Sequence, residues 1–373
     1  MNRSWSLVSG ISLLILLSCA SAMMAQEPLA TLPAGGAASA IAFNGQTNKI
    51  YVVGGLGNSL TEIDGLTFKS TTIPLQSTGS QVASTQIAVN PITNTIYVIN
   101  VVNNHVAVVD GATHAVSFVP TAASPYAVGI NLATNKLYVA DFGANMVTVV
   151  DGYKKTSVNI AVGTHPSAIA LNWVTNRIYV ANPGSNSVSV IDGHNNSVAN
   201  VPVGLYPTAL AVDVSRNKVY VANTQGNDLT EINGATNSTA NIIVGSHPAH
   251  VAVNATTNKV YVAFQIPGDI AVVSPATGIA TTVPAGLFEN EIRVDEWRNK
   301  IYVADPTGNQ LVIIDGATNT TKEVPGPGKY LWRIAMNPLT NEIYAANLMS
   351  DDVTIYAGAP GKLSLSLLES IQK

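Results

Sequence analysis

The chain has 373 residues, of which 47% are hydrophobic and 11% charged, with 29 glycines, 19 prolines and a single cysteine. Apolar content near one half excludes a disordered chain, and a lone cysteine excludes both a disulfide framework and any site built from several cysteine ligands. The formal net charge of −4 gives no general attraction for nucleic-acid phosphates or anionic lipid. This length suggests two or three domains unless the chain is one repetitive body.

The first 25 residues have the layout of a secretory signal peptide. Arg3 supplies a positive charge, the stretch 7–17 is apolar, and Ala20-Ser21-Ala22 is a small-residue cleavage site. The apolar stretch is too short to span a bilayer, and no later segment has the apolar length that a span needs. We therefore expect residues 1–25 to be removed, residues 26–373 to be exported to the periplasm or the cell surface, and no transmembrane span.

The same leader supports an alternative in which Cys19 becomes a lipid-anchored N-terminus. The segment Leu16-Leu17-Ser18-Cys19 resembles a bacterial lipobox. Leu17 is unusual at its place in that motif, and the site at Ala22 competes with it. The alternative makes the protein an outer-envelope lipoprotein, with Cys19 as the site of lipidation.

One hexapeptide built around a tyrosine recurs eight times along the chain. Its copies read TNKIYV, TNTIYV, TNKLYV, TNRIYV, RNKVYV, TNKVYV, RNKIYV and TNEIYA. The tyrosines are Tyr51, Tyr97, Tyr138, Tyr179, Tyr220, Tyr261, Tyr302 and Tyr344. A period of about 41 residues, kept over eight copies, indicates one structural unit repeated along the chain.

Each copy carries four short strand patterns with no helical pattern between them. In the fourth copy these are 168–172, 177–181, 187–192 and 197–203. An Asn or Asp opens the turn between the first and second strands, and the Asn of the hexapeptide closes it. The third strand ends in Asp-Gly or Asn-Gly in six copies, which is a strong signal for a tight hairpin.

Four antiparallel strands in a period of this length are typical of a β-propeller blade rather than a helical solenoid. We predict an all-β, eight-bladed propeller that fills residues 26–373 as one domain, with seven blades as the alternative. The segment 28–33 looks like a fourth strand without its own blade. We expect it to close the ring in the last blade beside 333–357, with the strand pattern at 362–368 outside it or competing with it.

The motif Tyr-Val-Ala-Asn at 179–182 and 220–223 resembles the YVTN-family β-propeller repeat, and the resemblance extends from about residue 35 to residue 358. Several copies depart from it at the last position, which holds Gly54, Asp141, Phe264 and Asp305. The resemblance implies a propeller exported to a bacterial envelope or an archaeal surface layer, and it implies no common reaction. Many propellers of this family have seven blades.

The position that opens the first strand differs among the copies. It is small or an amide in five, and ionisable in three successive copies, as His250, Glu291 and Arg333. Neighbouring departures from the repeat are His247, Phe288, Glu289, Tyr330 and Trp332, with Phe264 and Asp305 after the repeated tyrosine on the same face. We predict a binding site from these residues around the channel mouth. The alternative is an ion pair of Glu291 and Arg333, with His250 nearby, that only solvates the mouth.

The motifs of common active sites are missing from the sequence. It has no C-x-x-C-H, G-x-S-x-G, H-E-x-x-H or phosphate-loop motif, and the H-x-x-H of His247 and His250 falls on a loop, so we expect neither metal nor cofactor. We predict a non-catalytic binding or scaffold protein whose channel mouth contacts a protein, a glycan or a small ligand. The alternative is a channel-based enzyme or electron-transfer protein with an unidentified cofactor. Single-strand DNA binding, a third possibility, needs a basic groove that the acidic charge disfavours.

Overall fold

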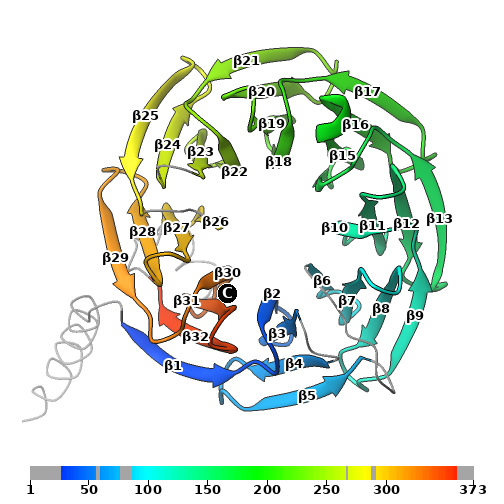
Figure 1. The fold of residues 1–373 in the computed structure, drawn as a ribbon, viewed down its shortest axis with the longest axis vertical. Coiled ribbons are helices and arrows are strands. Elements are labelled where there is room, and N and C mark those ends of the chain that lie inside the picture. Colours follow the sequence, from blue (N-terminus) through cyan, green and yellow to red (C-terminus); the bar gives the residue numbers. More distant parts are fainter. Residues whose placement is uncertain (1–26, 56–58, 76–85, 266–267, 287–290, 359–373) are drawn as a thin grey trace, which may run out of the picture.

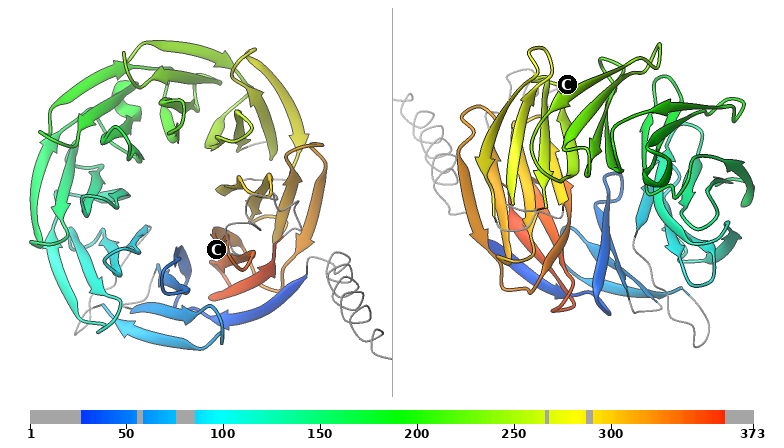
Figure 2. Two further views of the ribbon diagram at one scale, coloured as in Figure 1. Left: turned by 180° about the vertical axis from the view of Figure 1, so that it is seen from behind. Right: turned by 45° about the horizontal axis from the view of Figure 1, so that its top comes forward.

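The computed structural model describes residues 27–55, 59–75, 86–265, 268–286 and 291–358. These residues form eight four-stranded antiparallel sheets, arranged as blades around a central axis (Figure 1). Figure 2 shows the same closed ring from behind and in a tilted view. The predicted eight-bladed propeller is confirmed.

The strands follow one another from the centre of each blade to its outside. Blade 1 has β2 (Ala38–Asn44), β3 (Lys49–Gly54), β4 (Ser59–Asp64) and β5 (Ser70–Pro74); blade 2 has β6 (Ile87–Asn90), β7 (Thr95–Asn100), β8 (His105–Asp110) and β9 (Val116–Pro120). Blade 3 has β10 (Pro125–Asn131), β11 (Lys136–Asp141), β12 (Met146–Asp151) and β13 (Thr156–Ala161); blade 4 has β14 (Ala168–Asn172), β15 (Arg177–Asn182), β16 (Ser187–Asp192) and β17 (Val198–Pro202), with the short 3-10 helix η2 (Pro183–Ser185) between β15 and β16. Blade 5 has β18 (Pro207–Asp213), β19 (Lys218–Asn223), β20 (Asp228–Asn233) and β21 (Thr239–Ile243); blade 6 has β22 (Pro248–Asn254), β23 (Lys259–Phe264), β24 (Asp269–Ser274) and β25 (Ile279–Pro284). Blade 7 has β26 (Glu291–Asp295), β27 (Lys300–Asp305), β28 (Gln310–Asp315) and β29 (Thr321–Pro325); blade 8 has β30 (Leu331–Asn337), β31 (Glu342–Asn347) and β32 (Asp352–Ala357).

Blade 8 receives its outer strand from the start of the described chain. Strand β1 (Pro28–Pro33) pairs antiparallel with β32, and the sheet order is β1-β32-β31-β30. The expected ring closure by 28–33 is therefore confirmed (Figure 1). Residues 1–25, which we predict to be a signal peptide, and the strand predicted at 362–368 lie outside the described residues.

The repeated tyrosines form the core between neighbouring blades. All eight are at most 1% exposed. Tyr97 of blade 2, for example, packs with Leu137 and Val139 of blade 3, and Tyr344 packs with Ile50 and Val52 across the ring closure. Burying one large ring at each junction excludes water between the sheets and accounts for the tyrosine in every copy.

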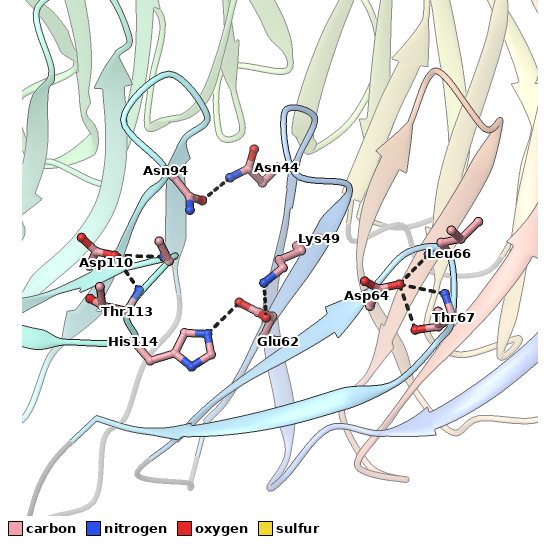
Figure 3. Close-up of polar contacts among 11 residues, drawn as sticks. Asn44, Lys49, Glu62, Asp64, Leu66, Thr67, Asn94, Asp110, Thr113 and His114 are labelled. Carbon is pink, nitrogen blue, oxygen red and sulfur yellow. Dashed lines mark hydrogen bonds and ion pairs between the residues drawn. The ribbon is translucent and has the colours of Figure 1, made fainter.

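The turns that join first and second strands tie adjacent blades together. Asn44 Nδ2 donates to Asn94 Oδ1 of the next blade at 2.9 Å (Figure 3). Equivalent bonds are Asn90 to Asn135, Asn131 to Asn176, Asn172 to Asn217, Asn254 to Asn299 and Asn337 to Asn48. The acceptor asparagines have φ near +50°, a left-handed conformation that asparagine tolerates better than most residues. The hexapeptide Asn therefore closes the turn, as predicted, and also accepts the bond from the preceding blade.

Two junctions use a different pair of residues. Asp213 and Asp295 replace the donor Asn, and an Arg replaces Thr three residues later. Arg216 Nη1 bonds Asp213 Oδ2 at 3.0 Å and Ala255 O of the next blade at 2.7 Å. Arg298 does the same with Asp295, at 3.0 Å, and with Pro338 O, at 3.1 Å. A carboxylate cannot donate, so the guanidinium supplies the bond to the next blade.

The Asp-Gly sequences after the third strands do not form two-residue hairpin turns. Asp64 Oδ1 accepts from the N–H groups of Leu66 and Thr67 (Figure 3). The left-handed residue is Phe68, four positions after the aspartate. Gly65 is needed for space, because an added Cβ would lie 2.8 Å from Asn48 O. The motif therefore marks a longer Asp-capped turn with a close backbone approach.

Candidate functional site

The loops after the fourth strands and those between second and third strands meet on one face. The link is again an asparagine: the His165 N–H donates to Asn145 Oδ1 at 2.8 Å, and the His247 N–H to Asn227 Oδ1 at 2.9 Å. Ser124, Tyr206 and Tyr330 are held in the same way. All five of these residues have positive φ. These bonds hold the loop backbone in place around the channel opening, which we name the mouth.

A space of about 500 Å³ lies inside the mouth, with residues from all eight blades in its wall. His250, Glu291 and Arg333 line it at the position where blades 3, 4 and 5 carry alanine. A second space of about 160 Å³ is lined by the same three side chains together with Gln86 and Arg293. The structure thus brings the three predicted ionisable residues together on successive blades.

Arg293 is a part of this cluster that sequence reasoning missed. Its Nη2 lies 2.5 Å from Glu291 Oε1, and its Nε bonds Ile334 O at 3.4 Å. Glu291 Oε2 accepts the Ile334 N–H at 2.6 Å, so both carboxylate oxygens are engaged. Every other blade has alanine or glycine at the position of Arg293: Ala42, Ala88, Gly129, Ala170, Ala211, Ala252 and Ala335. Comparing the eight copies two residues after the opening position of the first strand would have identified Arg293 from the sequence.

His250 is held neutral beside these charges. Burial is the main cause and, with the positive charges of Arg333 and Arg293, lowers the pKa of His250 to about 3. A neutral imidazole can both donate and accept one hydrogen bond, but it contributes no charge. Arg293, Arg333 and Glu291 therefore leave this level of the channel with one net positive charge.

Aromatic rings accompany the charges on blade 8. Tyr330 and Trp332 stack with centroids 5.7 Å apart and an angle of 18°, and the Arg333 guanidinium carbon lies 5.1 Å from the Trp332 ring centroid. Arginine and tryptophan at this distance form a cation–π contact that orients the guanidinium. The predicted members Tyr330, Trp332 and Arg333 therefore form one ordered group at the mouth.

Two of the predicted residues that the structure describes, Phe264 and Asp305, do not join this group. Phe264, 5% exposed, packs with Ala271 and Val244 in the core, where other blades bury an Asn with a Ser or Thr. Asp305, 1% exposed, accepts from the Thr307 and Gly308 N–H groups and from Gln310, so it caps a turn. Both departures from the repeat thus have structural reasons. Phe288 and Glu289 lie outside the described residues.

A second aromatic group, missed in the sequence, lies on blades 3 and 4. Tyr126, which lines the 500 Å³ space, is 5.9 Å from Phe142, and Phe142 stacks on His165 with centroids 4.6 Å apart and an angle of 10°. Blade 4 faces blade 8, which carries Tyr330 and Trp332, across the ring (Figure 1). The mouth therefore has aromatic side chains on both sides of its opening.

The described residues contain no group of three or more His, Cys, Asp and Glu side chains that could hold a metal ion. The histidine pair of the H-x-x-H segment diverges in its surroundings, because His247 is exposed at the mouth whereas His250 is half-buried in the channel. Across the described part of the chain, helices with the length and apolar character of a membrane span are absent.

Solved structures share the fold. The chain is similar to hydrazine synthase of Kuenenia stuttgartiensis, with a TM-score of 0.63 and 18% identity over 76% of this chain and 98% of that chain. It is similar to the Dos1 propeller (TM-score 0.76, 11% identity, 90% and 96% covered) and to Sqt1 of Saccharomyces cerevisiae (0.74, 8%, 90% and 100%). No protein-family model and no curated protein matches the sequence. Identities this low show the propeller fold alone.

Proposed function

We propose that the chain is an exported, non-catalytic propeller of the YVTN-like kind whose channel mouth binds a protein, a glycan or a small ligand. The observation that carries this proposal is the placement of His250, Glu291, Arg293 and Arg333 on three successive blades around one space. Blades 3, 4 and 5 close the same ring with alanine at the positions of His250, Glu291 and Arg333. The fold itself therefore does not require these charges.

Burial makes a purely solvating role a poor account of the cluster. The Glu291 side chain is 12% exposed and is tied to Arg293 and to the backbone of blade 8. Taking the Glu291 carboxylate this far out of water costs free energy that a solvent-exposed rim pair does not. A charged cluster kept at such a cost and open to a cavity is typical of a binding site.

Rigidity also favours binding by a preformed surface. Asparagine bonds join adjacent blades on both faces of the ring. Little ordering entropy is then lost when a ligand binds, so specificity lies in the side chains at the mouth.

Affinity capture from an envelope extract tests the proposal. The bait is the chain from residue 26, and its W332A/R333A variant removes the cation–π pair at the mouth. The matched control is W173A/K154A, which removes an exposed Trp and an exposed Lys from the opposite face. We expect capture by the wild type and the control and its loss in W332A/R333A, at unchanged thermal midpoints. Equal capture by both variants would refute a binding site at the mouth.

The non-catalytic part of the proposal has its own test. We expect protein isolated from the cells that naturally produce it to show no visible absorption band and no stoichiometric metal. A bound chromophore or metal would instead support the channel-based enzyme.

A further inference from the structure

The channel changes polarity along its axis. The spaces nearest the mouth are lined by His250, Glu291, Arg293 and Arg333, whereas a third space of about 360 Å³ is lined by apolar side chains that include Phe43, Val89, Ile130 and Met336. We call the positions equivalent to His250, Glu291 and Arg333 the charged level of the channel. Each of the apolar residues lies three positions after this level in its own first strand. The third space therefore lies deeper, toward the face of the asparagine turns.

The apolar level is only partly covered by protein. Phe43, Val89, Ile130 and Met336 are all half-buried, and the corresponding residues of the other four blades are half-buried as well. Apolar surface left open inside a cavity gains free energy when an apolar ligand covers it. Each of the three volumes is modest, but Arg293 and Ile87 line all of them. The three spaces are thus consecutive parts of one channel.

Arg293 stands where the two levels meet. It rises from the third position of its strand, between the charged first position and the apolar fourth, and half of its side chain is exposed. Together with Arg333 and Glu291 it gives the upper level one net positive charge, because His250 is neutral. A ligand with a negative head and an apolar tail matches this order of surfaces.

We propose that the channel binds a free single-chain amphipathic anion, such as a fatty-acid carboxylate, with its head at Arg293 and Arg333 and its tail among Phe43, Val89, Ile130 and Met336. This deepens the proposed function by naming a ligand class for the same site, and it rests on that function. An arginine guanidinium binds a carboxylate through two parallel N–H···O hydrogen bonds, and a methylene chain fits a channel lined by aliphatic side chains.

Calorimetric titration with defined alkyl compounds tests the inference. Decanoate and decyl sulfate, below their micelle-forming concentrations, should bind with one site per chain. Decanol and decyltrimethylammonium should bind at least about tenfold more weakly, because they lack the charge-assisted bonds of the head. Along the series hexanoate, octanoate and decanoate, affinity should rise about two- to fourfold per methylene. Equal affinity for the cationic compound, or no dependence on chain length, would overturn the proposal.

Two substitutions in the charged cluster should change decanoate affinity in opposite directions. Arg293→Ala, which gives blade 7 the residue of most other blades, should weaken decanoate binding about tenfold or more. Glu291→Gln keeps an acceptor for the Ile334 N–H but removes the negative charge, so it should tighten binding severalfold. The charge-matched control Lys154→Ala lies on an exposed turn and should change nothing. If Glu291→Gln weakened binding as Arg293→Ala does, the electrostatic basis would be wrong.

A substitution among the apolar residues that would contact the alkyl tail, and a binding experiment with lipid vesicles, complete the test. Met336→Gln preserves size and should weaken decanoate severalfold while leaving acetate, which lacks a tail, unaffected. Binding to phosphatidylglycerol vesicles without binding of free decanoate would overturn the inference in favour of a membrane surface. If decanoate fails to bind while capture still depends on Trp332 and Arg333, only this inference fails and the proposed function stands.

Discussion

Asn337 Nδ2 donates a hydrogen bond to Asn48 Oδ1 at 2.8 Å, although 289 residues separate the two in the sequence. This bond joins the last blade to the first and repeats the bond that joins Asn44 to Asn94. The ring closure therefore uses the same contact as five of the internal junctions, in addition to the pairing of β1 with β32.

Replacing the donor Asn337 at the ring closure should destabilise the protein, and a second substitution that copies the Asp–Arg pairs of two other junctions should restore stability. Asn337→Asp loses the donated bond, so we expect the free energy of unfolding to fall by about 1–2 kcal/mol. Adding Thr340→Arg reproduces the pairs of Asp213 with Arg216 and Asp295 with Arg298 and should restore most of the loss. Urea unfolding of the single and double variants measures both effects. A double variant no more stable than Asn337→Asp would show that the Asp–Arg pair is no substitute.

Asp141 should make the protein less stable as the pH rises. It stands where blades 2, 4, 5 and 8 have a buried asparagine, and burial raises its pKa to about 7. The folded state therefore favours the protonated form, so the stabilisation is complete below the unfolded pKa of 3.8 and is lost as pH rises through 7. Asp141→Asn should raise the free energy of unfolding at pH 8 by up to about 4 kcal/mol and have little effect at pH 4. A gain of the same size at both pH values would argue against the titration.

His250 should stay neutral through the physiological range. Its pKa is lowered to about 3, so the folded state disfavours the protonated imidazole, and its contribution to stability falls as pH drops below the unfolded value of 6.5. NMR titration should show no protonation above pH 5. In Arg293→Ala/Arg333→Ala the pKa of His250 should rise, because two positive charges are gone. An unchanged pKa in that variant would leave burial as the whole cause.

Removing β1 should expose the edge of β32. The strand pairs with β32 from Pro28 to Pro33, and Ala30 and Leu32 pack against the core cluster between blades 8 and 1. A chain that begins at residue 34 should have a lower thermal midpoint and should associate through the open edge. A peptide of residues 27–33 should reverse both effects. Light scattering and thermal unfolding, with and without the peptide, measure them.

The repeat allowed the architecture to be predicted almost to the residue. The strands expected at 168–172 and 187–192 have the observed bounds, and those at 177–181 and 197–203 differ by one residue at their ends. Because the eight copies share the same turn positions, the strand ends can be located by comparing the copies rather than from residue propensities alone. The turn after the third strand was misjudged because Asp-Gly has more than one use, and here the glycine gives space to an asparagine.

The candidate site could be predicted only in part. Comparison of the residue that opens each first strand identifies His250, Glu291 and Arg333, which differ in charge from their counterparts. Arg293 is identified only when the residue two positions further along each first strand is compared as well. It also selected Phe264 and Asp305, whose differences are absorbed in the core and in a turn. A departure from a repeat shows that a position is different, whereas only burial and contacts show whether the difference faces the channel.

Native mass spectrometry of the protein from the cells that produce it tests most directly whether the charged level of the channel binds a ligand. We predict a non-covalent mass increment on the wild-type chain that is lost in Arg293→Ala/Arg333→Ala, while both proteins keep the same fold by circular dichroism. The same increment on both chains, or none on the wild type, would contradict a binding role for this channel.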